Sequence, residues 1–111
     1  MSPVASPPAT LVLNEKALAT SATTAIMAAA YTVPANGTLN IAVGIESGAT
    51  ATTFLITRNG TQYLAINAGN NLTAGAEYDV SLPVVAGDTV NFETGAATTL
   101  AVLEAFFVLG Q

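Results

Sequence analysis

Hydrophobic and polar residues alternate along several short segments of this chain, with the two-residue period of a β-strand. Residues 38–46 carry the clearest alternation, and residues 77–84 and 89–93 repeat it. The apolar positions are Leu39, Ile41, Val43 and Ile45 in the first segment, and Tyr78, Val80, Leu82, Val84, Val90 and Phe92 in the other two. Turn-forming residues separate the segments, so the pattern predicts short strands that point these apolar side chains into one core.

The dipeptide Asn59-Gly60 lies between two β-rich segments, 52–58 and 61–67. A type I′ turn needs positive φ at both central positions, which Asn and Gly adopt readily, so the dipeptide predicts a β-hairpin. The two-residue turn also fixes the register of the two strands. It pairs Arg58 with Thr61, Ile56 with Tyr63, Leu55 with Leu64 and Phe54 with Ala65. One predicted face holds Phe54, Ile56, Tyr63 and Ala65, and the other holds Leu55, Leu64 and Ile66.

Residues 98–109 form the longest dense apolar run, and they are apolar on both alternations except for Glu104. Ala, Leu and Glu favour a buried helix as the alternative, but the Thr, Val and Phe residues favour a strand. A strand that is apolar on both faces predicts that one face packs in the core and the other meets a partner. We assign Leu103, Phe107 and Leu109 to the core, and Val102, Glu104, Phe106 and Val108 to a subunit interface.

Residues 1–24 have the composition of an extended N-terminal arm, and residues 25–111 that of the folded domain. Proline at positions 3, 7 and 8 favours extended backbone and opposes regular pairing. A short strand is predicted at 10–13, one helical turn after Asn14 is the alternative for the next residues, and a further strand is predicted at 25–31. We expect the arm to bind a partner through Pro3, Pro7, Pro8, Leu11 and Leu13.

The predicted fold class is all-β: a single antiparallel β-sandwich, jelly-roll-like, with the extended arm in front of it. Seven or eight short strands without a convincing helix give two packed sheets. Pro83 lacks an N–H to donate to a ladder, so the strand that contains it is expected to end there or to lie at an edge.

Charged residues make up only 8% of the chain, compared with about 25% in an ordinary soluble domain. The net charge is −5, and Lys16 and Arg58 are the only basic residues. Neutralising phosphates takes several basic side chains, so we expect neither nucleic-acid nor membrane binding. A surface with so few charges indicates a subunit whose faces are covered in an assembly. The first residues lack the features of a signal peptide, which predicts synthesis in the cytoplasm.

The chain has neither His nor Cys, which are the commonest catalytic bases, thiol nucleophiles and zinc ligands. We therefore expect no enzyme activity, no cofactor and no small-molecule substrate. Glu77 and Asp79 share one face of a predicted strand, where a solvated surface explains them better than paired catalytic carboxylates. Oxygen ligands for Ca²⁺ are available, but without EF-hand spacing they fit turns better. These residues are Asp88, Glu93, Asn67, Asn70 and Asn71.

Three stretches together resemble a known family. They are YTVPANGTL at 31–39, TTFLITRNGTQYLAIN at 52–67 and YDVSLPVVAGDTVNF at 78–92, followed by the aromatic closing strand. The pattern over residues 31–109 resembles the small β-sandwich decoration (cement) proteins of tailed bacteriophage capsids. More distantly, it is similar to the trimeric jelly rolls of the tumour-necrosis-factor type.

The resemblance implies a virion structural protein that binds the major capsid protein between capsomers on the capsid exterior, as a homotrimer. Three other classes fit the residues: a phage tail or head-fibre domain, a strand-donating subunit of an extracellular filament, and a carbohydrate-binding sandwich. A closed trimer has an axis at which equivalent residues meet, whereas a strand-donating filament gives an open ladder of oligomers. Copies of Glu104 that meet near such an axis would repel one another unless a cation compensates.

Overall fold

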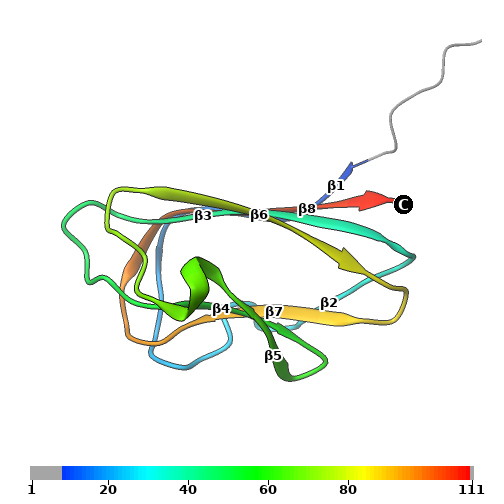
Figure 1. Ribbon diagram of the computed structural model, residues 1–111, viewed down its shortest axis with the longest axis horizontal. Helices are drawn as coiled ribbons and strands as arrows, with labels where there is room; N and C mark the ends of the chain where they lie inside the picture. Colours follow the sequence, from blue (N-terminus) through cyan, green and yellow to red (C-terminus); the bar gives the residue numbers. More distant parts are fainter. Residues whose placement is uncertain (1–8, 111) are drawn as a thin grey trace, which may run out of the picture.

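Two four-stranded antiparallel sheets pack face to face in this protein (Figure 1). The structure is a computed structural model that describes residues 9–110. The strands are β1 (Ala9–Ala19), β2 (Tyr31–Thr32), β3 (Gly37–Ile45), β4 (Phe54–Arg58), β5 (Thr61–Ala65), β6 (Glu77–Val84), β7 (Thr89–Thr94) and β8 (Thr99–Leu109), with a short 3₁₀ element, η1 (Ile66–Gly69). Sheet A has the order β1-β8-β3-β6 and sheet B the order β2-β7-β4-β5, which is the strand order of a jelly roll. The predicted fold class is confirmed.

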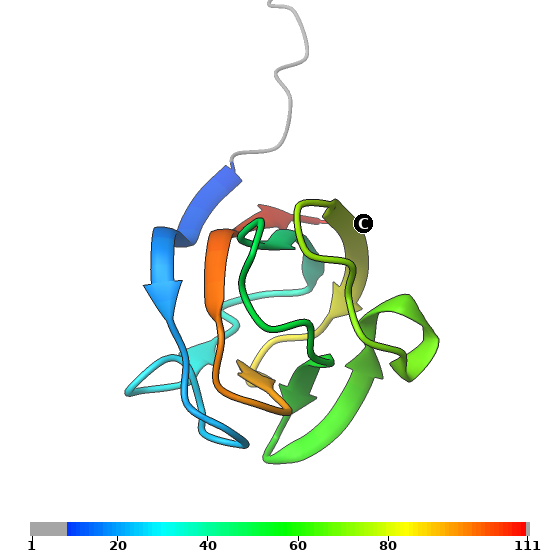
Figure 2. The ribbon, with the colours of Figure 1, turned by 90° about the vertical axis from the view of Figure 1, so that its left-hand side faces the viewer.

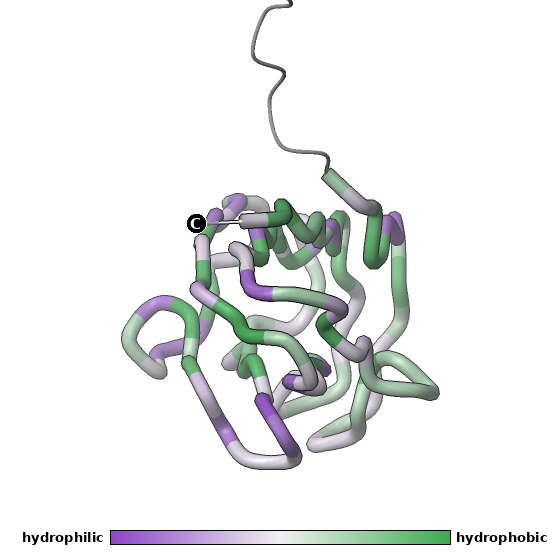
Figure 3. Tube along the Cα trace, turned by 90° about the vertical axis from the view of Figure 1, so that its right-hand side faces the viewer, coloured by the Kyte–Doolittle hydropathy of each residue, from purple (hydrophilic) through white to green (hydrophobic). Residues whose placement is uncertain are grey.

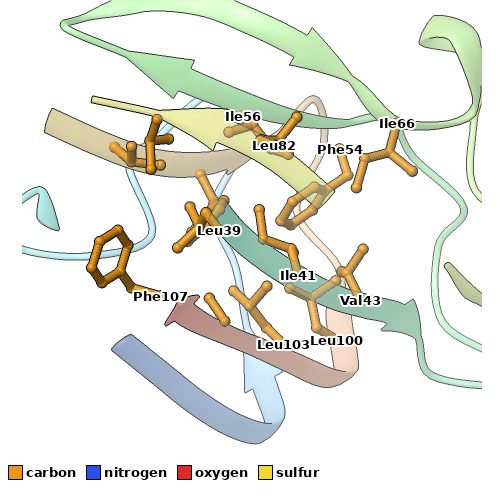
Figure 4. Close-up of a cluster of buried hydrophobic side chains, with 14 of the residues drawn as sticks. Leu39, Ile41, Val43, Phe54, Ile56, Ile66, Leu82, Leu100, Leu103 and Phe107 are labelled. Atoms are coloured by element: carbon orange, nitrogen blue, oxygen red, sulfur yellow. The ribbon is translucent and has the colours of Figure 1, made fainter. Parts of the chain in front are cut away.

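The core lies between the two sheets, and the alternating residues fill it as predicted (Figure 4). Leu39, Ile41, Val43 and Ile45 are all buried in β3. From sheet B, Phe54 and Phe92 stack with their ring centroids 5.8 Å apart. The strand that contains Pro83, β6, is an edge strand of sheet A, as the missing N–H of proline predicted.

The closing apolar run is the strand β8, and the helical alternative is wrong. It lies between β1 and β3, with Leu103 and Phe107 buried in the core. The β3–β8 register shifts between Gly44 and Ile45, and Leu100, which pairs with Ile45, lies in the core. One detail of the predicted faces needs correction. Leu109, assigned to the core, lies at the end of the strand and is 43% exposed.

The hairpin of β4 and β5 turns at Asn59-Gly60, which have φ angles of 54° and 80°. Arg58 pairs with Thr61 as predicted, but the register shifts by one residue beyond Thr57. Tyr63 takes the extra position. Its ring packs under the Arg58 guanidinium, and its hydroxyl donates to the Pro83 carbonyl of β6 at 3.2 Å. The predicted faces are therefore wrong beyond this point: Ile56 opposes Leu64, and Leu55 opposes Ala65.

The N-terminal region differs most from its prediction. Residues 9–19 form an edge strand of sheet A that pairs along β8, and Asn14 lies in this strand and caps no helical turn. The chain then crosses to sheet B along one side of the sandwich (Figure 2). Residue 24 is therefore no boundary between an arm and a domain. The arm residues Pro3, Pro7 and Pro8 lie outside the described residues.

The crossing segment lies along the edge of β7, where a strand was predicted at 25–31. Only its last residue, Tyr31, belongs to a strand, because side-chain bonds replace most of the ladder. The Asn91 amide accepts from the Met27 N–H at 3.0 Å and donates to the Met27 carbonyl at 2.9 Å. Ile26 N–H donates to the Phe92 carbonyl at 2.8 Å. These bonds cover the edge of β7.

Truncation of the core side chain Leu103 should show which face of β8 packs in the core. Leu103→Ala is expected to lower the free energy of unfolding by about 2–5 kcal/mol, because it leaves a cavity between the sheets. The adjacent change Val102→Ala, on the other face, should cost about 1 kcal/mol or less. Urea unfolding followed by circular dichroism measures both. A larger loss for Val102→Ala would mean that the faces of β8 are assigned the wrong way round.

Candidate functional site: an assembly surface

The outer face of sheet A is the surface on which the predicted interface residues gather. The strand register arranges it as four rows of residues across the four strands. From β1 to β6 these rows are Ala9, Val108, Thr38 and Pro83; Leu11, Phe106, Asn40 and Ser81; Asn14, Glu104, Ala42 and Asp79; and Lys16, Val102, Gly44 and Glu77. The residues between them in β3 and β8 point into the core, so these sixteen side-chain positions face outward.

The predicted interface residues Val102, Glu104, Phe106 and Val108 form one column of this face, along β8. Each is half-buried by its neighbours in β1 and β3. We call this column the β8 ridge. The structure brings these residues together, and whether they meet another subunit stays a prediction.

The predicted arm residues separate into three groups. Leu11 lies on the outer face beside Phe106 and is 53% exposed. Leu13 opposes Ala105, so it faces the core and is half-buried. The register shift between Leu11 and Leu13 explains why two residues of the same parity face opposite ways. The three prolines lie before the described residues. Figure 3 views the trace along the long axis of the sandwich and colours each residue by its hydropathy.

A trough runs beside the ridge, along β3. Asn40 and Ala42 form the floor of a hollow of about 310 Å³, which Glu104 and Phe106 flank on one side and Asp79 on the other. A second hollow of about 280 Å³ continues it over Gly44, between Val102 and Glu77. Gly44 has no room for a side chain, because a Cβ there would lie 2.7 Å from the Ala76 carbonyl oxygen. We call these two hollows together the β3 trough.

The charges on this face are separated by sign. Glu104, Asp79 and Glu77 lie on β8 and β6, and Lys16 lies on β1. Three strand spacings, about 14 Å, separate Lys16 from Glu77 in the same row. Among residues 9–110, the only outward cation of the face is therefore at one edge. Two of the three carboxylates are at the other edge, and no described cation lies beside them.

The sheet edges differ in how they are protected. The edge of β6 carries Pro83 together with Glu77 and Asp79, and proline and charge both discourage pairing. The edge of β7 is covered by residues 22–27. The edge of β5, TQYLA, has neither a charge nor a proline. β1 is uncharged over ATLVL and charged at Glu15 and Lys16.

A buried carboxylate ties two turns together at one end of the sandwich. Asp88 is 7% exposed and accepts hydrogen bonds from the Val85 N–H at 3.1 Å and the Asn59 side-chain amide at 3.2 Å. The Val85 bond lowers the pKa of Asp88, the Asn59 bond and the Arg58 charge add to the effect, and burial opposes it. Asn59 also accepts from the Thr89 N–H at 2.9 Å. This network holds the Asn59-Gly60 turn beside the start of β7.

The residues considered for chemistry are dispersed. Glu77 and Asp79 share the outer face of β6, as predicted. Among residues 9–110, no three His, Cys, Asp or Glu side chains gather closely enough to hold a metal ion. Asp88 is engaged in its turn, and the candidates Asn67, Asn70 and Asn71 lie in and after η1, away from it. No helix within the same residues is long and apolar enough to cross a membrane.

No protein-family model and no curated protein matches the chain. Among solved structures, the chain is similar to a subunit of the disulfide-linked pili that form Bacillus endospore appendages, with 20% identity and a TM-score of 0.49 over 99% of this chain and 98% of that one. It is also similar to the catalytic unit of a GH87 α-1,3-glucanase from Streptomyces thermodiastaticus, with 20% identity and a TM-score of 0.45 over 96% of this chain and 27% of that one. The present 111 residues contain no cysteine, so they cannot form a disulfide.

The Asp88 network should make stability depend on pH in one direction. Because the pKa of Asp88 is lowered on folding, its contribution is present above the unfolded pKa, at about 4, and is lost as the pH falls through the folded value. Asp88→Asn should therefore lower the urea midpoint at pH 7, and the difference from the native chain should shrink in acid. Asp79→Asn removes an exposed carboxylate and is the control. A difference that stays constant with pH would rule out this role for Asp88.

Proposed function

We propose that this protein is a structural subunit that joins copies of itself edge to edge into an open filament. The observation that carries the proposal is the unequal protection of the sheet edges. Two edges are blunted or covered, and within residues 9–110 nothing covers two uncharged segments on opposite sides of the sandwich. An unprotected edge is a ready template for another strand.

The open edge of β5 offers backbone groups for pairing. Arg58 and Thr61 close a two-residue turn, so they exchange hydrogen bonds with each other. The next pair, Thr57 and Gln62, is then non-hydrogen-bonded, and the N–H and C=O of Gln62 point away from β4. These groups are at the free edge of sheet B.

The matching strand is the uncharged half of β1, ATLVL, which has five residues like β5. β1 lies on the opposite side of the sandwich from β5, so this contact joins two different surfaces. A contact between different surfaces repeats from copy to copy without closing, unless its rotation happens to complete a ring. A filament therefore follows from edges of this kind.

The low charge of the chain supports the same proposal. Seven acidic and two basic residues leave few like charges to keep copies apart when they are packed along a filament. No catalytic role is part of the proposal. A filament subunit of this kind would act outside the cell, and the capsid role inferred from the sequence remains a prediction. The two differ in geometry, since a decoration protein forms a closed trimer.

Blocking the β5 edge tests the proposal. Gln62→Pro removes an N–H that points to solvent and leaves the bonds to β4 intact. The purified native chain is expected to form an open series of oligomers in analytical ultracentrifugation and filaments in negative-stain electron microscopy. Gln62→Pro should lose the open series of oligomers and the filaments and form nothing larger than a dimer, with an unchanged circular dichroism spectrum. Gln62→Thr keeps the N–H and is the matched control.

A discrete trimer of the native chain that persists in Gln62→Pro would contradict the filament proposal and favour the capsid reading. The location of the protein in or outside the producing cells distinguishes the filament role from the capsid role independently. Immunogold labelling of the producing cells and of purified virions should mark filaments outside cells. Labelling on capsid exteriors alone would overturn the proposal.

A further inference from the structure

The outer face of sheet A is complementary in shape and in charge to a second copy of itself. We propose that it binds the same face of a second copy across a two-fold axis that runs along the strands. The inference goes beyond the edge pairing proposed above and does not depend on it. It uses the β8 ridge, the β3 trough and the charges at the two edges of the face.

The β8 ridge of one copy fits the β3 trough of the other in shape. The ridge and the trough lie in adjacent columns, on β8 and β3. An axis along the strands and between these two columns sets each ridge against the other copy's trough. Val102 then faces Gly44 of the second copy, Glu104 faces Ala42, and Phe106 faces Asn40. Val102 and Glu104 thus meet the small residues Gly44 and Ala42, and the two hollows accept the ridge of the second copy.

The charges at the two edges of the face are also complementary between the two copies. The same axis sets the β1 column against the β6 column of the second copy. Lys16 then lies over Glu77, with Asp79 in the next row. Facing sheets are about 10 Å apart, which a lysine and a glutamate span together. Two such pairs form, one at each edge of the interface, and supply the cation that each face lacks beside its carboxylates.

The other way to stack the two faces has neither property. An axis across the strands keeps β8 over β8, so ridge meets ridge and the troughs stay empty. It also puts Lys16 over Ala9 of the second copy, away from every carboxylate of the face. Shape and charge therefore favour the same orientation, in which equivalent strands of the two copies run in the same direction.

The area of the face sets the expected strength. Four strands and four rows cover about 19 by 24 Å, so pairing buries roughly 900 Å² in total. Specific interfaces bury about 1,200–2,000 Å², so one isolated pair should be weak. The paired faces carry six carboxylates and only two ammonium groups, and this excess of negative charge weakens the pair further. Copies already linked in a filament would gain from avidity, and the face would then join two filaments side by side.

Variants that swap the charges of Lys16 and Glu77 test the proposed dimer. Dimerisation is measured by sedimentation equilibrium in Gln62→Pro protein, where edge pairing is blocked. The background protein should show a weak monomer–dimer equilibrium. Lys16→Glu should weaken the dimer by at least about tenfold, because it adds like charges at each edge. Adding Glu77→Lys to Lys16→Glu should restore it. Adding Glu15→Lys gives the same net charge on the other side of β1 and should not restore it.

Two further variants test the ridge and the trough. Ala42→Leu fills the trough and should abolish the dimer while the urea midpoint stays unchanged. Glu104→Gln removes the closest like charges across the axis and should tighten the dimer at neutral pH. A dimer that persists in Ala42→Leu, or restoration by Glu15→Lys as well as by Glu77→Lys, would overturn the proposed face. Loss of filaments alone, with this dimer intact, would contradict only the edge proposal.

Discussion

The pairing of β8 with β3 at the centre of sheet A is the interaction on which the other features depend. Each strand contributes alternate side chains to the core, and Leu39, Val43 and Leu103 are fully buried there. Burying one such aliphatic side chain stabilises the fold by about 1.5–3 kcal/mol. The same ladder fixes which residues point outward. The ridge and the trough therefore occupy adjacent columns because the core requires this register.

The two-sided apolarity of β8 has two sources, and only one of them concerns a partner. A central strand is shielded on its outer side by its neighbours, so Val102, Phe106 and Val108 are already half-buried within one subunit. The remaining exposure, together with Leu11 at 53%, is what a second copy would cover. A short apolar surface beside separated charges gives weak and oriented association, as expected of subunits that gain strength by repetition.

Local patterns predicted the regular strands well. The two-residue period located β3, β6 and β7, and Asn-Gly located the hairpin turn, because both signals act within a few residues. The errors arose where contacts distant in sequence decide the register. Tyr63 takes an extra position in β5 and there contacts Arg58 and Pro83, and no local signal in the sequence marks that shift. β1 has no alternation to read, since it is an edge strand with charges at Glu15 and Lys16 and positive φ at Ala17.

The residues predicted for a subunit interface lie on one surface, because residue parity within β8 was correct from Val102 to Val108, and their role as an interface stays a prediction. The proposed complementarity of this surface to a second copy could not be predicted from the sequence, because it depends on which strand lies beside β8. Hydrogen–deuterium exchange of the Gln62 amide tests the central claim of edge pairing most directly. The account predicts rapid exchange in the monomer and strong protection in the assembled protein. Rapid exchange of Gln62 in both states would contradict it.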